Sequence, residues 1–164
     1  MHKKTKFNKQ DHRSLALWAT DCAEHVLPYF EKEYPEDDRP RKAIEAGRAW
    51  AHSPSFCEAK AKVRKRTKFS PSDVPMVMKE IRSASLASHA AARETDNASA
   101  RAAARSAGQA VATVHVPGHA RAAAAYSIKA VEAQGKNSAK EREWQYRHFP
   151  KHLSPIASTF LKIK

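Results

Sequence analysis

Residues 21–50 read DCAEHVLPYFEKEYPEDDRPRKAIEAGRAW and contain the end of one predicted helix and the start of another. The first helix has an apolar stripe at spacings of three and four residues, formed by Leu15, Trp18, Cys22 and Val26. Pro28 and Pro35 disfavour an uninterrupted helix, so the chain is expected to turn between them. Asp11 is expected to cap the first helix, and Asp38 the second.

The rest of the chain carries helical signals as well. Alternation of apolar and polar residues never lasts, β-branched residues are few, and alanine dominates the second half. Further helices are expected from about 70 to 95, 98 to 116, 119 to 134 and 137 to 149. The sequence therefore predicts an all-α fold, a single-domain bundle of about six or seven helices.

The predicted domain organisation follows from local composition. Residues 1–10 are basic and without periodicity, which indicates a flexible basic arm. Residues 11–150 are predicted to form a single α-helical domain that carries a basic, insert-like segment at 53–69. In the C-terminal tail, 151–164, three apolar residues either hold the terminus against the domain or leave it loose; they are Leu153, Ile156 and Phe160.

The balance of charged residues indicates which kinds of partner the protein favours. The chain of 164 residues has 30 Lys and Arg against 17 Asp and Glu, a net charge of +13, which favours anionic partners. Its two cysteines have no paired spacing and are interpreted as reduced thiols. No apolar run follows the basic N-terminus, and residues 110–131 are interrupted by histidine, proline, glycine and arginine. We expect a cytoplasmic protein without a membrane span.

Nine polar residues are candidates for a binding site or a structural cluster: Asp21, Glu24, His25, Asp38, Arg39, Arg41, His89, His115 and His119. The pairs Asp21–His25 and His115–His119 have the four-residue spacing that places two metal ligands on one helical face. Neither pair belongs to an HExxH motif, so a buried polar network joining helices is the favoured interpretation and a metal site the alternative. No metal or other cofactor is predicted.

Catalytic motifs are weak. Cys22 lies on an apolar stripe, where a thiol is usually an inert packing group, and no GxSxG motif occurs in the sequence. The chain has only four glycines, and a loop that binds phosphates through its backbone is usually rich in glycine, so such a loop is not expected. We therefore expect a protein that is not an enzyme, with a metal-dependent activity as the remaining alternative.

A compact basic segment suggests a second class of partner. It contains Lys60, Lys62, Arg64, Lys65, Arg66 and Lys68. A run of charge is usually a solvated face, and no recognised nucleic-acid-binding module surrounds this one. Nonspecific binding of nucleic acid through residues 60–68 is retained as an alternative function.

Four blocks within residues 13–150 resemble a known family: LALWATDCAEHVLPYFEKEYPEDDRPRKAIEAGRAWA, SHAAARE, AGQAVATVHVPGHARAAAAYSIKAV and EREWQYRHFP. They are similar to successive segments of the immunity-protein-five-like group, the putative immunity proteins of bacterial polymorphic toxin systems. The resemblance implies an α-helical cytoplasmic protein that binds a cognate toxin and neutralises it without chemistry of its own. By position, the family-like polar residues include Asp21, His25, Asp38 and Arg39, together with the three later histidines.

The acidic stretch before the second helix is the predicted docking loop for a toxin. A protein that blocks a nuclease is expected to present acidic groups to a basic active-site cleft. Glu36 and Asp37 lie at the centre of the acidic stretch and are the residues that we expect to contact such a partner.

Overall fold

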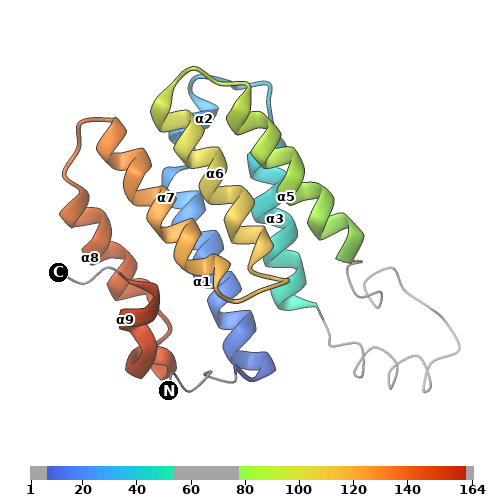
Figure 1. Cartoon of the computed structure of the whole chain (residues 1–164), viewed down its shortest axis with the longest axis vertical. Coiled ribbons are helices and arrows are strands. Elements are labelled where there is room, and N and C mark those ends of the chain that lie inside the picture. Colours follow the sequence, from blue (N-terminus) through green and yellow to red (C-terminus); the bar gives the residue numbers. More distant parts are fainter. Residues whose placement is uncertain (1–6, 54–77, 162–164) are drawn as a thin grey trace, which may run out of the picture.

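The computed structural model describes residues 7–53 and 78–161. Its helices in chain order are α1 (Lys9–Val26), α2 (Pro28–Glu31), α3 (Arg39–His52), α5 (Met78–Arg93), α6 (Ala98–Ala112), α7 (His119–Ala133), α8 (Ser138–His148), the 3₁₀ helix η2 (Lys151–Ile156) and α9 (Ala157–Phe160). No strand occurs in the described ranges, and the predicted all-α bundle is confirmed (Figure 1).

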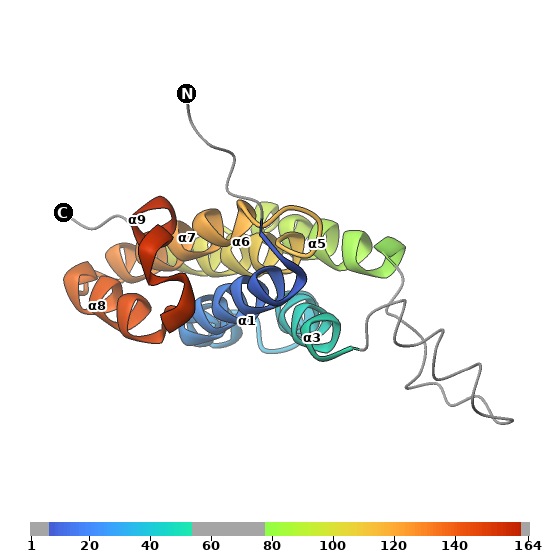
Figure 2. The ribbon, with the colours of Figure 1, turned by 90° about the horizontal axis from the view of Figure 1, so that it is seen from below.

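The helices form two packed layers. Helices α5, α6 and α7 lie side by side, with α6 in the centre, and α1 and α3 cover one face of this layer (Figure 2). The short helices at the C-terminal end, α8, η2 and α9, close one edge of the bundle. The main core lies between the layers and contains the large side chains of Leu15, Trp18, Ile44, Ile81 and Phe149.

Small side chains bring the helices of the α5–α7 layer close together. Ser85 Oγ donates to the carbonyl of Gly108 at 2.9 Å, and Ser88 Oγ donates to the carbonyl of Ala104 at 2.8 Å. On the other side of α6, Ser106 Oγ donates to the carbonyl of Ala123 at 2.9 Å. Each serine satisfies its hydroxyl with a backbone carbonyl of the neighbouring helix, so the alanine-rich faces pack without leaving a buried donor unpaired.

Helices α1 and α3 also approach closely, at a glycine. A Cβ atom added to Gly47 would lie 2.8 Å from Cγ2 of the buried Thr20, which is closer than carbon atoms pack. The same position on α3 lies against the backbone of Val111 on α6. Because residue 47 has no side chain, α3 can approach both α1, in its own layer, and α6, in the other layer, at this point.

Two predicted helix caps differ from those observed. Helix α1 begins at Lys9 with Asn8 as its cap, and Asp11 completes a capping box by accepting from the backbone N–H of Asn8 at 3.1 Å. Asp38 does occupy the cap position of α3, but its side chain makes no capping bond and instead pairs with Lys42 at 2.9 Å. Pro40 has no N–H for a cap to bind, and the backbone N–H of Arg39, at the first position of α3, donates to Asp37 Oδ1 at 3.1 Å.

The C-terminal end packs against the bundle. Leu153, Phe160 and Leu161 are buried, and the Phe160 ring lies 6.0 Å from that of Phe149. Of the two alternatives for the tail, this favours the one in which its apolar residues hold the chain against the domain as far as Leu161. The division into arm, domain and tail stays a prediction, and the basic segment at Lys60–Lys68 lies outside the described residues. Within the described ranges, no helix has the length and apolar character needed to cross a membrane.

Candidate partner-binding surface

The nine predicted site residues do not form one cluster. The structure distributes them over separate groups, each of which joins different helices. The first group connects α1, α2 and α3: Arg48 Nη2 lies 2.7 Å from Asp21 Oδ1 and also contacts the carboxylate of Glu24. Arg41 Nε donates to Glu31 at 2.5 Å. These charged groups lie at the half-exposed seam between the helices and fix their relative positions.

The arginines of this first group change the acidity of Glu24. The hydrogen bond from Arg48, reinforced by the charges of Arg48 and Arg41, lowers the pKa of Glu24 below its usual value. The carboxylate therefore stays ionised across the neutral range, and the Glu24–Arg48 pair is retained there.

The second group joins the start of α3 to the end of α5. Arg39 makes a two-pronged contact with Asp37, with Nε to Oδ1 at 2.9 Å and Nη2 to Oδ2 at 2.7 Å. The same guanidinium reaches Glu94 at 2.5 Å. Hydrogen bonding by Arg39 lowers the pKa of Asp37, so this carboxylate is ionised and committed to holding the arginine.

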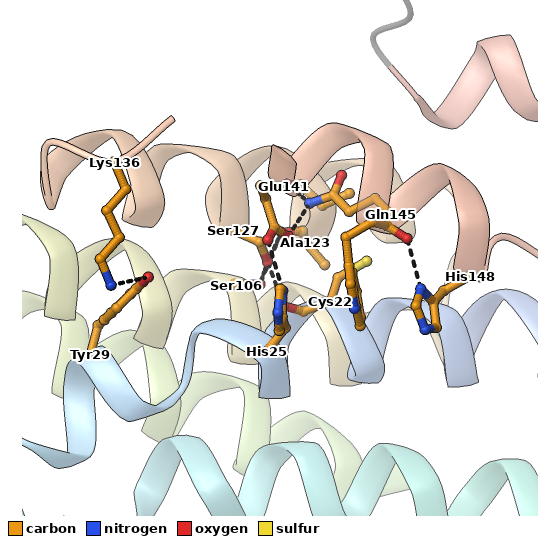
Figure 3. Close-up of polar contacts among 12 residues, drawn as sticks. Cys22, His25, Tyr29, Ser106, Ala123, Ser127, Lys136, Glu141, Gln145 and His148 are labelled. Carbon is orange, nitrogen blue, oxygen red and sulfur yellow. Dashed lines mark hydrogen bonds and ion pairs between the residues drawn. The ribbon is translucent and has the colours of Figure 1, made fainter. Parts of the chain in front are cut away.

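The third group joins α1 to α8 (Figure 3). His25 Nδ1 lies 2.7 Å from Glu141 Oε2 and must be the donor, because a carboxylate only accepts. Glu141 is 3% exposed, and its other oxygen accepts from Gln145 Nε2 at 2.9 Å. The His25 ring stacks on Trp144 at 4.0 Å between centroids, and Trp144 stacks in turn on His148 at 4.1 Å. A buried carboxylate thus fixes an imidazole at the surface.

The later histidines lie on the other layer. The ring of His89 covers Gly108, and Arg105 Nη1 lies 3.3 Å from His89 Nδ1. Because the guanidinium only donates, His89 Nδ1 accepts and the ring is neutral. His119 Nδ1 donates to Gln109 Oε1 at 2.7 Å, and His115 is exposed. Neither Asp21 nor His25 is brought to these histidines, and the described residues contain no group of three His, Cys, Asp or Glu arranged to hold a metal ion.

The environment of His89 predicts a pH dependence of stability. Burial lowers the pKa of His89 below its usual value, and the positive charges of Arg105 and Arg93 lower it further. The unfolded chain therefore binds this proton more readily than the folded protein does, and the His89 contribution to stability is lost as the pH falls below about 6.5. We expect His89→Gln to reduce this loss when the free energies of unfolding are compared by urea denaturation between neutral and mildly acidic pH.

A histidine elsewhere supplies the control: His148 is exposed, and its Nδ1 donates to a backbone carbonyl within its own helix. If His89→Gln and His148→Gln gave the same pH dependence as the parent protein, the proposed effect of burial and of the two arginines on His89 would be wrong.

Sequence reasoning missed several members of these groups. Arg48, Glu31 and Glu141 complete the contacts between helices but were not among the predicted residues. A local signal for Glu141 exists, since Gln145 follows four residues later on the same helical face and bonds to it. The partner, His25, is 116 residues away and no local pattern identifies it.

Acidic residues concentrate around the loop between α2 and α3. Residues 21–48 contain eight of the chain's 17 acidic residues and five Lys or Arg, a local net charge of −3 in a chain of +13. Within the described part of the chain, Glu33 and Glu36 are exposed and make no ion pair, whereas Asp37 holds Arg39. The exposed negative charge of the loop therefore comes from Glu33 and Glu36 more than from Asp37.

Comparison with known protein families assigns the chain to one of them. The sequence model of the family described as "Imm-5 like putative immunity protein" matches residues 5–70 and 75–152. The chain belongs to this family. No curated protein and no solved structure matches the sequence. The contacts between helices described above are therefore a structural account of an Imm-5 like chain, and the resemblance of its four blocks is confirmed.

Proposed function

We propose that this chain is an immunity protein that acts in the cytoplasm, where it binds a cognate toxin and neutralises it by contact, without catalysis of its own. The observation that carries the proposal is the family match, which extends over residues 5–70 and 75–152. The many ion pairs between helices suit this role, because they hold a rigid surface for a partner and reduce the ordering cost of binding.

The proposed docking surface is the acidic loop between α2 and α3. The loop is negatively charged although the whole chain has a net charge of +13. Opposite charges across an interface accelerate the encounter of two proteins and fix their orientation, so the loop suits a basic partner. Glu33 and Glu36 present their carboxylates to solvent. Asp37 supports the loop by holding Arg39, so it acts on the docking surface through the loop conformation. The matching toxin surface is basic, as in the active-site cleft of a nuclease.

The double variant Glu33→Gln/Glu36→Gln tests this surface. We expect its association rate constant for the toxin to fall about three- to tenfold at low salt, with a smaller change in the dissociation rate, because exposed charges act mainly on encounter. The matched control is Glu80→Gln/Asp96→Asn, which removes the same charge from exposed positions on or beside α5. Surface plasmon resonance at two salt concentrations measures both rates.

To obtain the toxin for this measurement, the products of genes adjacent to the gene of this chain are expressed one at a time, and a product that arrests growth is taken as the candidate toxin. Co-expression of the present chain should restore growth. If no neighbouring product is toxic or bound, the immunity function is wrong. If a toxin is bound but both double variants behave alike, the immunity function stands and the acidic docking loop is wrong.

A further inference from the structure

The outward face of the α5–α7 layer is basic. Five cationic residues lie on the solvent-facing stripes of the three helices and define what we term the basic face: Arg82, Arg93, Arg101, Arg105 and Lys129. Helical periodicity places no Asp or Glu on these stripes. Glu80 lies on another side of α5, Glu94 is held by Arg39, and Glu132 is paired with Arg142. The face therefore carries positive charge only.

These cations differ from the other arginines of the protein. On α3 and α8, arginines such as Arg39, Arg48 and Arg142 each contact a carboxylate. Among the described residues, none of the four arginines of the basic face has an acidic partner. Ion pairs thus join the helices elsewhere, while the guanidinium groups of the basic face keep their charge available.

Two contacts hold part of this charge in place. Arg101 donates to the carbonyl of Thr95 through Nε at 3.2 Å and Nη2 at 2.8 Å, which leaves its remaining N–H groups available. Arg105 is half-buried beside His89, with Nη1 3.3 Å from His89 Nδ1. Burial is the main reason that the pKa of His89 is lowered, and the positive charges of Arg105 and Arg93 lower it further, because both guanidinium groups lie near the ring. An anion placed here would relieve the repulsion among these groups.

The shape and composition of the basic face identify the anion. Alanines occupy positions 90, 98, 112 and 122 between the cations, so no large side chains project there, although Leu86 does on α5. The face has one half-buried aromatic residue, Tyr126, and thus offers no series of rings on which unpaired bases stack. Helix α6, with 15 residues, is about 22 Å long and can follow roughly two-thirds of a duplex turn of about 34 Å.

We infer that the basic face binds double-stranded nucleic acid through its phosphate backbone, without reading the base sequence. Cations spread over a broad surface match a polymer with regularly spaced charges better than they match a single acidic side chain. The residues of the basic face are distinct from those of the acidic docking loop, which precedes α3 of the other layer, and from those of the basic segment 60–68.

The test compares two triple variants that both lower the net charge from +13 to +10. Arg82→Gln/Arg93→Gln/Arg105→Gln removes three cations of the basic face. Lys32→Gln/Lys140→Gln/Lys151→Gln removes three exposed cations from other parts of the molecule. Fluorescence anisotropy with a labelled 20-base-pair duplex measures the dissociation constant over a range of salt concentrations, and circular dichroism confirms that each variant is folded.

We expect the first variant to bind the duplex at least about tenfold more weakly at moderate salt and to lower the slope of log K against log salt by about 2 to 3, with changes below about twofold for the second. Equal losses in the two variants, or no binding by the parent protein at low salt, would overturn the proposal. So would full retention of binding by the first variant together with its loss on neutralising residues 60–68.

Two competitors identify the class of ligand. A single-stranded oligonucleotide of equal charge should compete less well than the duplex, because the face lacks stacking rings. Polyglutamate of equal charge should also compete less well. If either displaced the duplex more effectively, the ligand would be a single strand or an acidic protein surface, and the assignment to a duplex would be wrong.

Discussion

Trp18→Ala is expected to lower the free energy of unfolding by about 3–5 kcal/mol, the largest loss that we predict for a single substitution. The indole of Trp18 is 1% exposed in the main core and packs edge-on against Phe149, with 4.9 Å between ring centroids. Its Nε1 donates to the carbonyl of Gln145 at 3.0 Å. Truncation therefore leaves a cavity and an unsatisfied buried carbonyl between α1 and α8.

The measurement is urea denaturation followed by circular dichroism, with two control variants. Trp18→Phe keeps an aromatic ring but loses the N–H donor, so it should cost less, about 1–3 kcal/mol. Trp50→Ala removes the same side chain at a half-buried position, where it lies beside His12, and should also cost less than Trp18→Ala. A Trp18→Ala variant as stable as Trp50→Ala would show that Trp18 is not the central packing residue that the structure makes it.

The position of Trp18 in the core was predictable from local sequence. The stripe of Leu15, Trp18, Cys22 and Val26 is buried throughout, because a spacing of three and four residues determines one face of a helix regardless of distant contacts. Helix α6 follows the same rule, since Ala104, Ala107, Gly108 and Val111 recur at spacings of three and four residues and are all buried. Helical periodicity is local, and for this reason it predicted the fold class correctly.

The cap of the first helix shows where local signals become ambiguous. Asn8 and Asp11 are three residues apart, and in a capping box each accepts from the backbone N–H of the other. Either residue therefore resembles a cap in the sequence. The geometry gives the cap position to Asn8, because helical hydrogen bonding begins with its carbonyl, which accepts from His12 N–H at 3.1 Å.

The candidate site was less predictable because its contacts are distant in sequence. The sequence suggests a single set of nine polar residues, but Asp21 pairs with Arg48 on α3, while His25 binds Glu141 on α8. The choice of partner depends on which helices become neighbours, and helix periodicity does not determine that. The two alternative roles of these residues, contact with a toxin and fixation of the helices, stay predictions. Glu33 and Glu36, the positions of the docking variant, make no ion pair with any described residue.

The distribution of charge between the two layers could not be predicted from the sequence alone. The sequence shows a chain of +13 with an acidic stretch, but it does not show that the cations of α5, α6 and α7 share one face. The layered arrangement brings Arg93, Arg101 and Arg105 together and places the acidic residues of α1 and α3 on the other layer (Figure 2). A chain with a net charge of +13 thus carries an acidic surface as well as a basic one.

Loss of the contact between His25 and Glu141 is expected to lower the free energy of unfolding substantially. Removing one partner of a buried pair leaves an uncompensated charge, which typically costs 3–5 kcal/mol. We expect about 2 kcal/mol for His25→Ala, below that range, because the imidazole is 42% exposed and water can reach part of the site. The loss arises mainly from Glu141, whose 3% exposed carboxylate keeps only the hydrogen bond from Gln145.

This origin of the loss predicts a rescue. Adding Glu141→Gln to His25→Ala should recover part of the lost stability, because a glutamine removes the buried charge and its carbonyl still accepts from Gln145 Nε2. In the parent protein the same Glu141→Gln change should lower stability, since His25 then loses its charged acceptor. The sign of the effect of Glu141→Gln thus depends on whether His25 is present, which a double-mutant cycle by urea denaturation measures directly. If Glu141→Gln lowered stability equally in both backgrounds, the two side chains would be energetically independent, and the contact between α1 and α8 would depend on the packing of Trp18 and Trp144 and on the hydrogen bond from Trp18 to Gln145.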